Sequence, residues 1–99
     1  MKALLINPQD QTIAAVEVAD LAAIRQLVGY DTLESDAVGS EGDRLYFDEE
    51  CFIRGSTGRF QIDSVIPVAG KGVLVGSDGD ALSDVRTGID DLRQRIRFQ

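Results

Sequence analysis

Three consecutive carboxylates, Asp48-Glu49-Glu50, form the densest group of residues in the chain that could do chemistry. Neighbouring carboxylates can bind a divalent cation or act as a general acid, and Arg54 or Lys71 could complete such a site. Consecutive residues of a strand alternate between the two faces of a sheet, so these carboxylates do not converge by default. The alternative is a solvated acidic turn, which also discourages edge-to-edge aggregation.

The chain contains no histidine, which limits the available chemistry. Ser-His-Asp catalysis, Cys-His catalysis and His-containing zinc sites are excluded. Cys51 is the single cysteine, and an acidic neighbour at Glu50 disfavours a reactive thiolate, so we expect a packed thiol. The sequence offers no complete catalytic set, and we expect no cofactor.

Two glycine-containing segments resemble ligand loops only superficially. The segment 70–76 contains Lys71 but lacks the P-loop pattern, because its glycines bracket a strand. It is either a loop whose N–H groups could meet an anion or a peptide, or a bend before a buried strand. The segment Asp78-Gly79-Asp80 lacks the remaining ligands of a calcium loop and predicts a turn.

Length and charge define the class of protein. A chain of 99 residues that is 43% hydrophobic predicts one globular domain over residues 1–99. Seventeen acidic residues against ten basic ones give a net charge of −7, which disfavours direct binding to nucleic acids and to anionic membranes. With no apolar run near 20 residues, no signal peptide and no possible intrachain disulfide, we expect a cytoplasmic protein without a membrane span.

The first 29 residues predict a β-hairpin followed by a helix. The β-rich runs 2–6 and 12–18 flank a polar turn, in which Asn7 and Asp10 can supply side-chain hydrogen bonds. Asp20 is a suitable helix cap, and Gly29 suits the left-handed end of a helix. Between them lies one apolar helical stripe, made of Leu21, Ile24, Leu27 and Val28.

The middle of the chain predicts strands. Residues 30–38 form an edge or partly exposed strand, and residues 44–47 and 51–54 form the two arms of a central hairpin around the acidic turn. The segment 55–58 is a flexible connection.

Two further strands are predicted after this connection. Residues 60–68 begin with alternation until Pro67 marks an edge, a bend or a break. Residues 73–75 form a short strand buried on both faces.

A final helix is predicted from a stripe with steps of three and four residues, made of Leu82, Val85, Ile89, Leu92 and Ile96. Gly88 would lie inside this helix, and Asp91 and Arg95 would form an ion pair. The element order is then roughly β-β-α-β-β-β-β-α. We expect a two-layer α+β domain, with two helices on one face of a mostly antiparallel sheet of about five or six strands.

Several segments in order resemble a family of small proteins of unknown function from phages and bacteria. They are Met1-Lys2-Ala3-Leu4, Asn7-Pro8, Val16-Glu17-Val18, Leu27-Val28-Gly29, Leu45-Tyr46-Phe47-Asp48-Glu49-Glu50 and Gly70-x-Gly72-Val73-Leu74-Val75-Gly76. Members of that family have a central Leu-Tyr-x-Asp-Glu-Glu hairpin, followed by a glycine-bracketed apolar strand. The resemblance covers roughly residues 1–80.

This chain departs from the family pattern in three places. Cys51 stands where a glycine is usual, residues 55–58 replace an Asn/Pro-rich loop, and the final helix is additional. The resemblance implies a phage or mobile-element origin, but no reaction and no cofactor.

These observations favour a small acidic, non-enzymatic interaction or accessory protein. Its candidate interaction surface consists of Asp48, Glu49, Glu50, Arg54 and Lys71. The partner would be another protein or a second copy, because a homodimer lets small cores share surface. One alternative is a carboxylate-based binder of a small ligand or metal, or a minimal enzyme. Another is an acidic DNA mimic with carboxylates spaced along one surface like phosphates.

Overall fold

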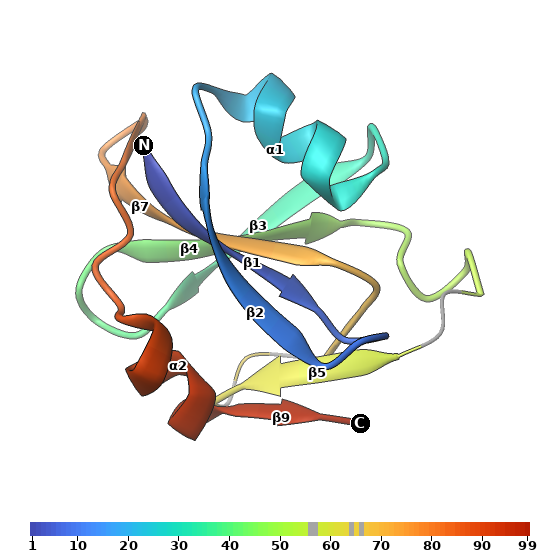
Figure 1. Cartoon of the computed structure of the whole chain (residues 1–99). Coiled ribbons are helices and arrows are strands. Elements are labelled where there is room, and N and C mark those ends of the chain that lie inside the picture. Colours follow the sequence, from blue (N-terminus) through green and yellow to red (C-terminus); the bar gives the residue numbers. More distant parts are fainter. Residues whose placement is uncertain (56–57, 64, 66) are drawn as a thin grey trace.

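An antiparallel six-stranded sheet forms the centre of the molecule (Figure 1). The computed structural model describes residues 1–55, 58–63, 65 and 67–99. The strands of this large sheet are β1 (Lys2–Asn7), β2 (Thr12–Glu17), β3 (Leu33–Val38), β4 (Asp43–Asp48), β7 (Gly72–Asp78) and β8 (Ala81–Ser83). Their order is β2-β1-β7-β4-β3, and β8 pairs with the end of β7.

A second, smaller sheet and two helices complete the fold. The small sheet has the order β6 (Val68–Ala69), β5 (Arg59–Ile62), β9 (Ile96–Phe98). The helices are α1 (Leu21–Val28) and α2 (Ile89–Arg95). The predicted α+β class, the two helices and the mostly antiparallel sheet are confirmed, whereas the small sheet was not foreseen.

Local signals of the N-terminal part are confirmed. The Asn7 side chain donates to Asp10 (3.2 Å) and accepts from the Gln9 N–H (3.1 Å), which fixes the turn between β1 and β2. The Asp20 carboxylate accepts from the Ala23 N–H (3.0 Å), and Gly29 has a φ of 97°, so both predicted ends of α1 are correct.

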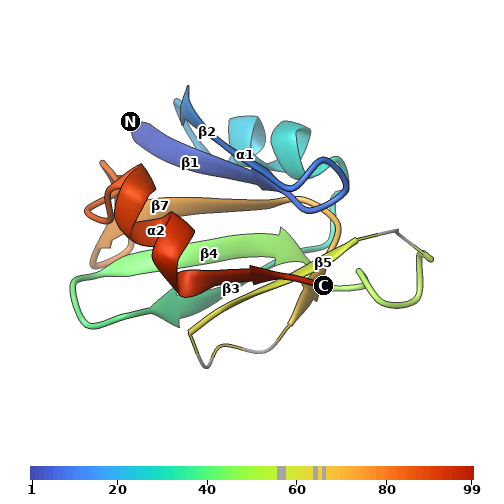
Figure 2. The same cartoon turned by 60° about the horizontal axis from the view of Figure 1, so that its bottom comes forward.

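The two helices lie on opposite faces of the large sheet, which corrects the expected two-layer arrangement (Figures 1 and 2). Ile24 and Val28 of α1 pack with Val73 and Val75 on one face. On the other face, Leu92 of α2 joins a cluster that includes the small sheet. The molecule therefore has three layers, because the small sheet needs the second face to bury its own apolar side.

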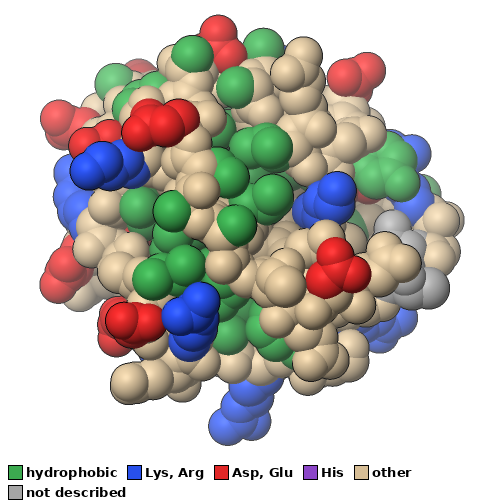
Figure 3. All heavy atoms as spheres, viewed as in Figure 1, with side chains coloured by type: hydrophobic (Ala, Val, Ile, Leu, Met, Phe, Trp, Pro, Cys, Tyr) green, Lys and Arg blue, Asp and Glu red, His purple; other side chains and the backbone are tan. Residues whose placement is uncertain are grey.

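Central β7 is buried on both faces, as predicted. It pairs with β1 on one side and β4 on the other, and Val73, Leu74 and Val75 are fully buried. The outer strands are β2 and β3, which confirms an edge strand within the predicted range 30–38, although the strand begins only at Leu33. Hydrophobic side chains gather on the face along β2 and toward α2 (Figure 3).

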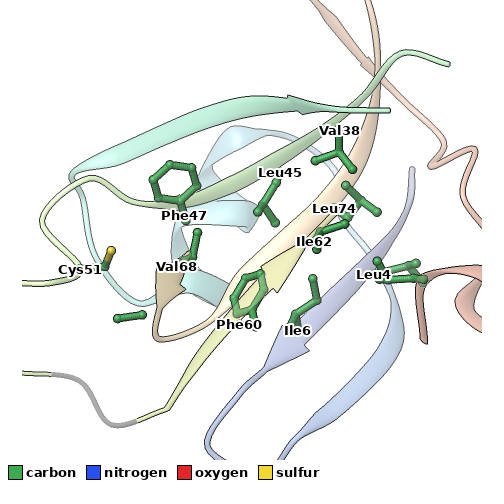
Figure 4. Close-up of a cluster of buried hydrophobic side chains, with 12 residues drawn as sticks. Leu4, Ile6, Val38, Leu45, Phe47, Cys51, Phe60, Ile62, Val68 and Leu74 are labelled. Atoms are coloured by element: carbon green, nitrogen blue, oxygen red, sulfur yellow. The ribbon is translucent and has the colours of Figure 1, made fainter. Parts of the chain in front are cut away.

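The larger core cluster lies between the large sheet and the small one (Figure 4). Phe60 and Ile62 of β5 point into it, as the alternation predicted, and meet Leu45 and Leu74 of the large sheet. A Cβ atom at Gly72 would lie 2.7 Å from the Phe60 ring, so only glycine admits this close approach of the two sheets.

The predicted long final helix is wrong. Residues 81–83 form β8, the helix begins only at Ile89 after Gly88, and residues 96–98 form β9. The cause is a distant contact, since the buried Asp43 carboxylate accepts from the backbone N–H groups of Arg86 and Thr87 (2.9 Å each). These N–H groups donate to a side chain from a distant strand instead of to the backbone carbonyls of a helix. The predicted pair of Asp91 and Arg95 is present at 3.2 Å.

The predicted second arm of the central hairpin is also wrong. Residues 51–54 form turns, because the Cys51 N–H donates to the Asp48 carbonyl and the Ile53 N–H donates to the Glu50 carbonyl (3.1 Å each). The next strand begins at Arg59. Residues 56 and 57 of the predicted flexible connection lie outside the described residues.

Candidate interaction surface

A buried carboxylate at the end of β4 organises the acidic segment. Asp48 is only 3% exposed, although it belongs to the most acidic stretch of the chain. Its side chain accepts hydrogen bonds from the Thr32 hydroxyl, the Glu50 N–H (3.1 Å) and Arg54 Nε (2.5 Å). Three donors from two segments therefore converge on one carboxylate, which satisfies its charge internally.

Arg54 closes this network on the outside. Its Nη2 donates to the Thr32 hydroxyl (3.0 Å) and to Glu50 (3.4 Å), and its guanidinium lies 4.0 Å from the centre of the Tyr30 ring. Contact with an aromatic face favours the cation. The turn that follows β4 is thereby fastened to the segment that precedes β3.

The electrostatics agree with this geometry. Burial of the Asp48 carboxyl group opposes its ionisation, but hydrogen bonds from Thr32 and Arg54 outweigh burial, and the pKa of Asp48 lies below its ordinary value. The hydrogen bond to Asp48 likewise raises the pKa of Arg54 above its ordinary value. Both groups are charged at neutral pH, so the turn is held by an ionic hydrogen-bonded network.

The same turn exposes two large apolar side chains at its tip. Ile53 is 80% exposed and Phe52 is 51% exposed, which is unusual for such residues. Cys51, immediately before them, is buried and anchors the base of the turn in the core. We call residues 49–55 the apolar-tipped turn; in Figure 1 it projects on the right, away from the sheet.

Charges of both signs surround the tip. Glu49 and Glu50 are exposed before it, Arg54 follows it, and the Arg59 guanidinium lies 5.2 Å from the centre of the Phe52 ring. The surface is therefore an apolar centre with a mixed polar rim, which is the composition of a protein-binding patch.

Lys71 lies apart from this network. It is exposed and lines a hollow of about 480 Å³ together with Asn7, Gln9 and Tyr30. A neighbouring hollow of about 610 Å³ is lined by Arg25, Tyr30 and Arg54, among others. Gly29 and Tyr30 border both hollows, with Lys71 lining the first and Arg54 the second.

The predicted surface is thus brought together only in part. Asp48, Glu50 and Arg54 contact one another, Glu49 is exposed beside them, and Lys71 belongs to a different hollow. Sequence reasoning missed Tyr30 and Thr32, whose place depends on the register that pairs Leu33 with Asp48. It also missed the exposure of Phe52 and Ile53, because a second strand was expected to bury them.

Two features of the described residues bear on the alternatives. Among them, no group of three or more His, Cys, Asp or Glu side chains is placed to hold a metal ion. Within the same residues, neither helix has the length and apolar character that crossing a membrane requires.

Comparisons with protein-family models, with curated proteins and with solved structures found no match. The resemblance to small phage and bacterial proteins, and the mobile-element origin that it implies, therefore stay predictions.

Proposed function

We propose that this chain is a small acidic accessory protein that acts by binding a protein partner through the apolar-tipped turn, and not by catalysis. The observation that carries the proposal is the exposure of Ile53 and Phe52 on a turn fixed by the Asp48 network. Exposing adjacent large apolar side chains is unfavourable unless a partner covers them.

The fixed shape of the turn supports recognition. A preorganised turn loses less conformational entropy on binding than a flexible one, so more of the contact energy appears as affinity. An aromatic and an aliphatic anchor inside a charged rim are typical of the residues that dominate protein interfaces. Glu49 and Glu50 then belong to the charged rim around the apolar tip, and Asp48 fixes the conformation of the turn.

The experiment places a photo-crosslinking amino acid at position 53 and, as a control, at exposed Asp78, the last residue of β7. We expect a crosslinked protein that is specific to position 53. Titration of that purified protein should then give an affinity at least about tenfold weaker for Ile53→Asp, and unchanged for Asp78→Lys, with both variants folded by circular dichroism. Equal affinities for wild type and Ile53→Asp, or crosslinking at position 78 alone, would contradict the proposal.

Binding of a small anionic ligand is a second candidate function. The two hollows that meet at Tyr30 favour it, because Lys71, Arg25 and Arg54 line them. A thermal-shift screen with nucleotides and with Mg²⁺, Mn²⁺ and Ca²⁺ separates the two functions. A saturable rise in melting temperature that Lys71→Met abolishes would favour binding of a small ligand. A melting temperature that no ligand changes would favour binding of a protein partner.

A further inference from the structure

The outer side of edge strand β2 presents backbone groups in a defined pattern. Met1 and Val18 exchange both backbone hydrogen bonds (2.6 and 2.9 Å). Hydrogen-bonded pairs alternate along an antiparallel ladder, so Val16, Ala14 and Thr12 also direct their N–H and C=O groups toward β1. The N–H and C=O groups of the residues between them, Ile13, Ala15 and Glu17, therefore point outward, where no further strand pairs with β2 in the described part of the chain.

The two edges of the large sheet differ in protection. Edge strand β3 carries Glu34 and Asp36 within its length. In β2 the residues from Thr12 to Val16 are uncharged, and only Glu17 at its end carries a charge. Charged residues normally protect sheet edges from pairing, so β2 has the character of an edge that another strand covers.

An apolar groove lies beside this edge. It measures about 490 Å³, and Leu4, Ala15, Val85 and Ile89 are among its lining residues. Ala15 is directly opposite Leu4 in the β1–β2 ladder, so both side chains point to the same face as the groove. Figure 3, in which β2 lies in front, shows hydrophobic side chains gathered along β2 and toward α2. A strand added to β2 could place an apolar side chain into the groove, beside small Ala15.

We propose that β2 pairs antiparallel with β2 of a second copy of this chain, around a two-fold axis at Ala14. This register sets Ile13 opposite Ala15 of the partner subunit, and the reverse, so that four outward backbone hydrogen bonds form. Ile13 lies on the same face as Ala15, because it is opposite core residue Ile6. Each Ile13 therefore reaches toward the groove of the other copy, and the exposed alanines at the axis allow the backbones to approach.

The strand supplies both halves of this contact, which favours a second copy as its occupant: Ile13 is the apolar side chain, and Ala15 lines the groove that receives it. Lys2 lies opposite Glu17 at one end of β2, and Asp10 lies in the turn at the other end. Antiparallel pairing brings the Asp10 end of each copy to the end of the other that carries both Lys2 and Glu17, so each end of the seam holds charges of both signs. In this register Glu17 lies opposite Gln11 of the partner subunit, whereas a shift by two residues would set it against Ile13.

This dimer leaves the apolar-tipped turn free. Figures 1 and 2 both show the turn well away from β2, so pairing through β2 would present two copies of the turn to other proteins. Pairing through β2 uses a different surface from the apolar-tipped turn, so the dimer does not depend on the proposed function.

The first test measures molar mass by light scattering over a concentration series for wild type, Ala15→Lys and the matched control Ala37→Lys. Ala37 is an exposed alanine on the other edge strand. We expect wild type and Ala37→Lys to double in mass with concentration, and Ala15→Lys to dissociate with a Kd raised about tenfold or more, since symmetry introduces the lysine twice. A wild type that stays monomeric, or an equal loss of dimer in both variants, would overturn the proposal.

The second test determines the register of the β2–β2 pairing and whether the apolar-tipped turn takes part in the dimer. Ala14 faces itself in a pair without mutual hydrogen bonds, where Cβ atoms approach closely enough for a disulfide. Under mild oxidation, Ala14→Cys should form a covalent dimer much faster than the control Ala37→Cys. Ile53→Asp should leave the dimer intact. Equal crosslinking of the two cysteine variants, or a dimer that is lost in Ile53→Asp, would place self-association elsewhere and refute pairing through β2.

Discussion

The two ends of β4 both carry a buried carboxylate, but the two carboxylates organise different parts of the chain. Asp43 at the start accepts from Arg86 and Thr87, which are more than 40 residues away. Asp48 at the end accepts from Glu50 and Arg54 in its own turn, and from Thr32. Asp43 therefore connects distant elements, whereas Asp48 shapes a local surface.

The partners of the two carboxylates differ in kind. Asp43 accepts from two backbone N–H groups and from the Thr87 hydroxyl, and thereby sets the path of the chain between β8 and α2. Asp48 adds a guanidinium, so its network contains a full positive charge. Loss of Asp43 should weaken the whole fold, and loss of Asp48 should mainly loosen the turn.

The largest effect is expected for Asp43→Ala. It leaves the N–H groups of Arg86 and Thr87 without their acceptor, and we expect a loss of about 3 kcal/mol in the free energy of unfolding, since each unsatisfied buried donor costs about 1–3 kcal/mol. Urea denaturation measures the loss, and amide hydrogen exchange should accelerate throughout α2 and β9. Faster exchange confined to residues 84–88 would show that the contact is only local.

The next effect is expected for Asp48→Asn. The amide keeps the shape of the side chain but removes the charge, and we expect a loss of about 2 kcal/mol because hydrogen bonds to charged groups contribute about 1.5–3 kcal/mol. Exchange should accelerate at the amides of Glu49, Glu50 and Cys51, while α2 stays protected. If α2 loses protection as much as in Asp43→Ala, the distinction between the two ends fails.

Acid should remove the difference between wild type and Asp48→Asn. The pKa of Asp48 is lowered in the folded protein. A lowered pKa contributes stability above the pKa of the unfolded chain, about 3.9 for aspartate, and this contribution is lost as pH falls through the folded pKa. The urea midpoints of wild type and Asp48→Asn, measured from pH 7 downward, should therefore begin to converge below about pH 4, and should meet once the pH is below the folded pKa. A gap that stays constant to pH 2 would show that the charge of Asp48 does not stabilise the turn.

The contrast between Asp43 and Asp48 also explains which parts of the fold could be predicted from sequence. Asp20 and Gly29 fix the ends of α1 within ten residues of chain, and the turn between β1 and β2 is fixed by its own Asn7 and Asp10. Both features depend on local contacts, so both could be predicted from sequence. The contacts of Asp43 join segments far apart in sequence, and no local pattern indicates them. A helical stripe through Leu82 and Val85 was therefore a correct observation with a wrong conclusion.

The candidate surface was predictable in its charges and not in its shape. Asp48, Glu50 and Arg54 stand out by composition, and the structure joins them. Their partners Thr32 and Tyr30 follow only from the pairing of β3 with β4, which sequence alone does not set. Phe52 and Ile53 have the residue types of a core strand, and their exposure becomes visible only once the Asp48 turn is known.

The smallest effect is expected for Glu50→Gln, compared with Glu49→Gln as the matched control. Glu50 lies 3.4 Å from Arg54, but its side chain is 46% exposed, so water competes for the pair. We expect a loss within about 0.5 kcal/mol at low salt that disappears at high salt, since exposed ion pairs contribute little and are screened. Urea midpoints at two salt concentrations measure it. A loss equal to that of Asp48→Asn would mean that Asp48 and Glu50 hold the turn jointly. The turn would then depend on several carboxylates, and the contrast between a single carboxylate with local partners and Asp43 with distant ones would fail.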